Sequence, residues 1–86
     1  MPEILLYKSI PCGYCSAAIR FLTEVKGLEI KIIDLTYKPE ERIALMRKTG
    51  KRTVPQIFIG DVFVGGYDEL RALDAKGGLD PLLQST

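Results

Sequence analysis

Hydrophobic residues along the chain follow two periodicities that alternate from one segment to the next. Short apolar runs that end at glycine, proline or charged residues are typical of buried strands, which we expect over residues 3–7, 29–33, 56–59 and 62–64. Segments whose apolar residues recur at steps of three and four predict amphipathic helices over residues 13–26, 39–49 and 67–76. We expect residues 79–83 to pack back on the rest of the chain as a short tail.

The helical spacing also predicts which side chains face the core. These are, for the three helices in turn, Cys15, Ala18, Ile19, Leu22 and Val25, then Ile43 and Met46, then Leu70 and Leu73. The element order β-α-β-α-β-β-α belongs to the α/β class, because it requires a parallel strand pair with a crossover helix and then adds an antiparallel hairpin. We therefore predict one domain over residues 1–86, with a mixed four-stranded sheet flanked by three helices.

Charge and hydropathy exclude several classes of function. The formal net charge is only +1, so the chain lacks the basic excess of a nucleic-acid-binding protein. No apolar run approaches the roughly 20 residues needed to span a bilayer, and the first residues show no secretory signal. We expect a cytoplasmic protein that binds neither nucleic acid nor membrane.

Cys12 and Cys15 are the two cysteines of the chain, and they lie where a predicted strand gives way to a predicted helix. The absence of histidine excludes Cys–His catalysis and histidine-containing zinc sites. A zinc site of four cysteines would need two more from a partner chain. A CxxC pair in a chain without a secretory signal indicates thiol–disulfide chemistry in a reducing compartment.

The predicted helix distinguishes the two thiols. At the N-cap, Cys12 would face unpaired backbone N–H groups and the positive end of the helix dipole, which favour the thiolate, the attacking species. Cys15, one turn later on the apolar stripe, would resolve a mixed disulfide formed on Cys12. The alternative is that both are small core residues, which is compatible with the role of Cys15 but not with attack by Cys12.

The peptide bond between Val54 and Pro55 is a second informative feature. A proline just before a strand is often an edge or turn device. The functional alternative is a cis bond that turns the backbone of Val54 toward an incoming chain, which then pairs with it as an added strand.

Four motifs occur in order along the chain: Cys12-Gly-Tyr-Cys15, Thr53-Val-Pro-Gln-Ile-Phe-Ile59, Gly65-Gly66-x-Asp68 and Gly77-Gly-Leu-Asp-Pro-Leu-Leu83. Together they resemble the glutaredoxin family, in particular its small bacterial dithiol members, from end to end of the chain. The resemblance implies the thioredoxin fold. It also implies glutathione-dependent reduction of protein disulfides and of mixed disulfides between proteins and glutathione, so the expected partners are glutathione and such proteins.

The same resemblance implies a glutathione site near the cysteines. Its residues would be Tyr14, Thr53, Val54, Pro55, Gly66 and Asp68. The Val54 backbone would pair with the cysteinyl part of glutathione, and Gly66 and Asp68 would hold the γ-glutamyl end. Without the resemblance, Asp68 is explained as an acidic residue at the start of a helix.

Gly13 departs from the family pattern, which usually has proline between the cysteines. Within the resembled family, a residue other than proline at this position is associated with a [2Fe-2S] cluster that bridges two subunits, with glutathione as an additional ligand. The alternative function is therefore a cluster carrier or sensor that uses Cys12. We expect a monomer for the redox enzyme and a cluster-bridged dimer for this alternative.

Ser9 is a second departure, because the family usually has a lysine at this position. Lys8 lies one position earlier, where an extended strand points its side chain to the other face, and Lys51 and Arg52 are further candidate partners for a glutathione carboxylate. Such loop charges are more often solvated surface. Tyr67 replaces a third cysteine found in many related chains.

A third function to consider is an electron donor of the same fold that is served by thioredoxin reductase. The match of Tyr14, Thr53 and Asp68 to the glutathione-binding pattern argues against it.

Overall fold

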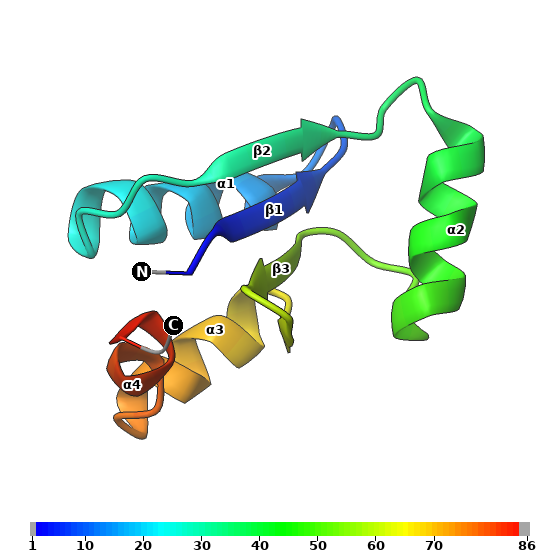
Figure 1. Ribbon diagram of the computed structural model, residues 1–86. Helices are drawn as coiled ribbons and strands as arrows, with labels where there is room; N and C mark the ends of the chain where they lie inside the picture. Colours follow the sequence, from blue (N-terminus) through cyan, green and yellow to red (C-terminus); the bar gives the residue numbers. More distant parts are fainter. Residues whose placement is uncertain (1, 85–86) are drawn as a thin grey trace.

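A mixed four-stranded sheet lies at the centre of the computed structural model, which describes residues 2–84. The strands are β1 (Ile4–Lys8), β2 (Lys31–Asp34), β3 (Gln56–Ile59) and β4 (Val62–Gly65), in the order β2-β1-β3-β4 (Figure 1). β1 runs parallel to β2 and antiparallel to β3, and β3 runs antiparallel to β4. The predicted α/β class and mixed sheet are confirmed.

The helices are more numerous than the three that the sequence predicts. They are α1 (Gly13–Arg20), its π-helical continuation η1 (Phe21–Val25), α2 (Pro39–Thr49), α3 (Tyr67–Ala75) and α4 (Leu79–Gln84). The expected C-terminal tail is thus a fourth α-helix. It forms because Leu79 and Leu83, four positions apart, are both buried on the same side of a helical turn.

Two of the expected core positions are wrong. Val25 is 67% exposed, because the π-helical turn that it ends, in which Lys26 N–H donates to Phe21 O, carries Val25 off the core face. Ile43 is 47% exposed, while Leu45, two positions later, packs against Leu35 and Phe58. Met46 is half-buried.

The two faces of the sheet carry separate cores, because neighbouring strand residues point to opposite sides. On one face, Ile4 and Leu6 of β1 pack with residues of α1, η1, α3 and α4. On the other, Leu5 and Tyr7 pack with residues of β3 and α2. Figure 1 accordingly shows α2 apart from the other helices.

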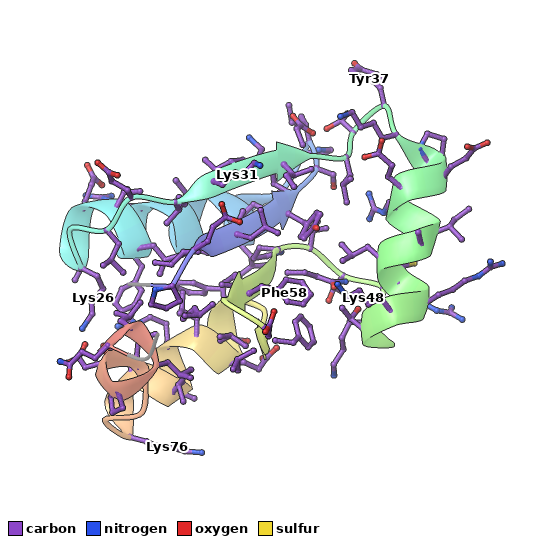
Figure 2. The ribbon with its side chains drawn as sticks, viewed as in Figure 1. Lys26, Lys31, Tyr37, Lys48, Phe58 and Lys76 are labelled. Carbon is purple, nitrogen blue, oxygen red and sulfur yellow. The ribbon has the colours of Figure 1, made fainter. Side chains whose placement is uncertain are left out.

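Charged side chains make contacts at the periphery of both cores. Lys48 of α2 reaches over the Phe58 ring, with Nζ 5.3 Å from its centroid (Figure 2). Lys26 forms ion pairs with Asp74 at 3.0 Å and Asp80 at 3.3 Å, which tie η1 to α3 and α4. Over residues 2–84, none of the helices is long and apolar enough to cross a membrane.

Candidate active site

Cys12 occupies the N-cap of α1, as predicted. Its backbone is extended, and its Sγ accepts a hydrogen bond from the N–H of Cys15 at 3.1 Å. The same sulfur, as a thiol, donates to the carbonyl oxygen of Val54 at 3.4 Å. The half-buried Cys12 sulfur therefore lies between the first turn of a helix and the loop before β3.

Cys15 differs sharply from Cys12 in its surroundings. It is 1% exposed, and burial raises the pKa of its thiol to about 12, with further contributions from the hydrogen bond to Cys12 and the charge of that thiolate. A backbone hydrogen bond from Ser9 and the positive charge of Lys8 act in the opposite direction. Substrate in solution can therefore reach Cys12 but not Cys15.

A groove of about 250 Å³ opens beside Cys12. Its lining residues are Tyr14, Thr53, Val54, Pro55, Gly66, Tyr67, Asp68 and Glu69. All six residues that the sequence predicts for a glutathione site are thus brought together from three parts of the chain. The Val54–Pro55 peptide bond is cis, as expected, and so is the Ile10–Pro11 bond, which was not expected.

Gln56 shapes the loop that carries half of the groove, a role that the sequence did not reveal. Its side chain is 2% exposed, donates to the carbonyl oxygens of Lys51 at 3.0 Å and Thr53 at 3.1 Å, and accepts from the Thr49 hydroxyl at 2.8 Å. These bonds fold residues 50–55 back over the start of β3. The available signal was an amide side chain within an otherwise apolar, buried strand.

The opposite wall depends on Gly65 and Gly66. Gly65 has φ of +112°, and a Cβ there would lie 2.9 Å from Glu69 Oε1. The Glu69 carboxylate accepts the N–H of Gly66 at 2.9 Å, at the start of α3. Asp68, in the first turn of α3, is exposed and pairs with no other side chain of the described part of the chain, so its carboxylate is available to a ligand.

The three basic residues named from the sequence do not line the groove. Lys51 and Arg52 are exposed on the preceding loop, and Lys8 is half-buried near Cys15. A fourth basic residue was missed: Arg42 of α2 donates from Nη1 to the buried Ser9 hydroxyl at 3.1 Å. Nothing in the local sequence pattern links these two positions, which lie 33 residues apart.

The loop before Cys12 is held by a second hydrogen-bonded group. The Ile10 N–H donates to the Thr36 hydroxyl at 3.0 Å. The Thr36 N–H, at 2.9 Å, and the Thr36 hydroxyl both donate to Asp34. These bonds hold the pKa of the Asp34 carboxyl below its usual value, with smaller contributions from the charges of Lys8 and Lys38.

Comparisons with known proteins agree with this geometry. The Glutaredoxin family model matches residues 4–64. A glutaredoxin of Pseudomonas aeruginosa is 45% identical over 85 residues, which are 99% of this chain and 100% of that protein. Glutaredoxin 3 of Escherichia coli K12 is 39% identical over 84 residues, covering 98% of this chain and 100% of the relative.

Solved structures give the same result. A glutaredoxin from Brucella melitensis superposes with a TM-score of 0.83 at 43% identity, over 98% of this chain and 90% of the other. A buckwheat glutaredoxin–glutathione complex superposes with a TM-score of 0.85 at 32% identity, over 95% and 76% of the two chains. The fold is therefore the thioredoxin fold of glutaredoxins.

We predict that Gln56→Leu weakens both the fold and the groove. The change removes two hydrogen bonds that the buried Gln56 amide donates, to the carbonyl oxygens of Lys51 and Thr53, which costs about 1–3 kcal/mol of unfolding free energy. Because the loop of Thr53 loosens, KM for glutathione should rise more than kcat falls. Urea unfolding and steady-state kinetics measure the two effects. Thr23→Val, which removes a hydroxyl bonded to Ile19 O away from the groove, should leave KM unchanged.

A second prediction concerns the pH dependence of stability. Since the folded-state pKa of Asp34 is lowered, its contribution is present above the ordinary carboxyl pKa of about 3.9 and is lost as pH falls through the folded-state value. The melting temperature of the wild type should therefore fall more steeply below about pH 4 than that of Asp34→Asn. If the melting temperatures of the two proteins fell in parallel between about pH 6 and about pH 2.5, the prediction would be contradicted.

Proposed function

The chain belongs to the glutaredoxin family of glutathione-dependent thiol–disulfide oxidoreductases, and we propose that it reduces protein disulfides and protein–glutathione mixed disulfides with Cys12 as nucleophile. The observation that carries this proposal is the placement of the Cys12 sulfur. It accepts an N–H at the start of α1 and contacts the carbonyl oxygen of Val54, a residue that lines the groove. We further propose that residues 1–86 act as one domain in the cytoplasm.

With a mixed disulfide, the Cys12 thiolate attacks the glutathione sulfur. The bond between glutathione and the protein substrate breaks, and the substrate leaves as a thiolate that takes up a proton. A second glutathione, as thiolate, attacks the glutathione sulfur of the Cys12–glutathione disulfide, and the bond to the Cys12 sulfur breaks. This step releases glutathione disulfide and regenerates the Cys12 thiolate, so two electrons pass from glutathione to the substrate.

With a protein disulfide, the Cys12 thiolate attacks one substrate sulfur and forms a mixed disulfide with it; the substrate disulfide breaks, and its other sulfur leaves as a thiolate that takes up a proton. Cys15 then attacks the Cys12 sulfur, which releases the reduced substrate and forms the Cys12–Cys15 disulfide. Two of the causes that raise the pKa of Cys15 are the hydrogen bond to Cys12 and the charge of its thiolate. Both are lost once Cys12 is in a mixed disulfide, so Cys15 ionises more easily at the step that needs it.

The groove is the proposed glutathione site. The Val54 carbonyl becomes available to a ligand N–H when Cys12 ionises and stops donating to it. The exposed Asp68 carboxylate would accept the ammonium group of the γ-glutamyl residue. Gly66 lines the groove with its N–H already occupied by Glu69, and a Cβ there would be in ordinary contact, 3.5 Å from the Pro55 carbonyl oxygen.

The remaining lining residues complete the proposed site. Tyr14 is 64% exposed at the mouth of the groove, where its ring faces that of Tyr67 at a centroid distance of 6.3 Å. Thr53 and Pro55 flank Val54 on the groove wall. A role in binding a glutathione carboxylate is still a prediction for Lys8, Lys51 and Arg52.

Cysteine variants test the proposal. Cys12→Ser should lose glutathione-dependent turnover of a small glutathione mixed disulfide, because it removes the attacking sulfur. Cys15→Ser should keep that activity and lose reduction of a protein disulfide, which requires the resolving thiol. Turnover is followed by NADPH oxidation coupled through glutathione reductase. Full activity of Cys12→Ser would refute the assignment.

A second candidate function is a [2Fe-2S] carrier or sensor, favoured by the open space at Gly13, where a Cβ would meet nothing within 4 Å. Cys12 is accessible enough to be a ligand, whereas the burial of Cys15 prevents it from being a second one. One chain would thus supply one thiolate, and a second copy and glutathione the others. Among residues 2–84 no group of three metal-binding side chains occurs.

Anaerobic reconstitution with iron, sulfide and glutathione tests this candidate. We expect visible absorption and elution as a dimer for the wild type, and neither for Cys12→Ser. Gly13→Pro, which restores the residue usual in the resembled family, should lower cluster yield. A colourless wild-type monomer would contradict the proposal.

A further inference from the structure

A second groove, of about 400 Å³, adjoins the candidate active site between α1–η1 and α3. Ser16 and Phe21 contribute to one wall, and Tyr67 and Arg71 to the other. Tyr67 also lines the first groove, so the two grooves meet at this side chain. Ser16 N–H donates to the carbonyl oxygen of Cys12, which places the second groove one helical turn from the proposed nucleophile.

Arg71 supplies a fixed positive charge in this groove. Its guanidinium carbon lies 4.7 Å from the centroid of the Phe21 ring and 5.8 Å from that of Tyr67, and Nη1 donates to the Tyr67 hydroxyl at 2.8 Å. Stacking on the two rings and the bond to Tyr67 restrict the side chain and leave the other guanidinium N–H groups free. No carboxylate within residues 2–84 forms an ion pair with it.

The other charged wall residue is less suited to bind an anion. Arg20 is already paired with Glu24 on the same helix at 2.9 Å, and both side chains are largely exposed. Arg71 is therefore the cation of this groove that is free to take an external carboxylate. The Phe21 and Tyr67 rings that line this groove suit the methylene groups of a glutamate or the apolar part of a peptide chain.

We propose that the second groove binds the polypeptide on one side of the target cysteine, and that Arg71 selects protein substrates with an acidic residue near that cysteine. The inference rests on the proposed function, because it takes the substrate sulfur to lie at Cys12. Arg71 takes no part in the bond changes; it acts on the affinity for the protein part of the substrate. Two observations support the assignment. Arg71 has a positive charge that no carboxylate of residues 2–84 pairs with, and Tyr67 lines both grooves.

A structural role for Arg71 is the competing explanation, since the same contacts pack α3 against η1. A purely structural role would change the turnover of all substrates equally. A specificity role instead changes the ratio between substrates that differ in charge beside the cysteine. The test therefore compares ratios of kcat/KM within each variant.

The substrates are glutathionylated peptides with one cysteine, identical except for glutamate, glutamine or lysine on both sides of it. For the wild type we expect kcat/KM to be about 5- to 20-fold higher for the glutamate than for the glutamine peptide, and lowest for lysine. Arg71→Met keeps the apolar stem and should bring the glutamate-to-glutamine ratio to about 1. Arg71→Lys keeps the charge and should retain part of the preference.

Lys76→Met is the matched control. This lysine follows α3 and projects from its far end, outside the second groove (Figure 2), so its loss should leave the ratio unchanged. About 1 M salt should reduce the wild-type ratio, because it screens exposed charges. Equal turnover of the three peptides by the wild type, or a preference that survives in Arg71→Met, would overturn the inference. Absence of turnover on every peptide and on a small mixed disulfide would instead refute the proposed function.

Discussion

The site depends on the approach of the Cys12 sulfur to the Val54 carbonyl, two groups that are 42 positions apart in the chain. The sheet makes this approach possible. β1 and β3 are antiparallel neighbours with Tyr7 opposite Gln56, so the end of β1 and the start of β3 lie at the same edge of the sheet. The loop that leads to Cys12 and the loop that contains Val54 therefore leave the sheet side by side. A shift of this register would separate the nucleophile from the groove.

The difference between the two cysteines follows from the same arrangement. One helical turn separates them, but Cys12 lies at the N-cap of α1 and is half-buried, while Cys15 is buried within the helix. The fold thus leaves one sulfur accessible and buries the other through their positions on the helix. The order of the proposed reaction, attack by Cys12 and then resolution by Cys15, is consistent with this difference in burial and with the raised pKa of Cys15.

Local signals predicted much of this structure. The CxxC spacing at a helix start, the Val-Pro pair before a strand and the double glycine before α3 each depend on neighbouring residues, and all appear where expected. Interactions between distant segments were not predictable in this way. Leu45 rather than Ile43 faces the sheet because of where α2 lies against Phe58. The role of Gln56 depends on the path of the loop that its side chain holds.

The basic residues are a second case in which contacts between distant segments were not predictable from the sequence. The sequence offered Lys8 as the basic residue nearest to Cys12 on its N-terminal side, because Ser9 stands where the family usually has a lysine. The structure brings a further basic residue to the loop before α1, because the Arg42 guanidinium of α2 donates to the Ser9 hydroxyl, while the Ser9 backbone interacts with the Cys15 thiol. The small serine leaves room for this contact at a buried position. The surroundings of Ser9, whose backbone contacts the Cys15 thiol, therefore depend on how α2 packs against the loop before α1, and not on the loop sequence alone.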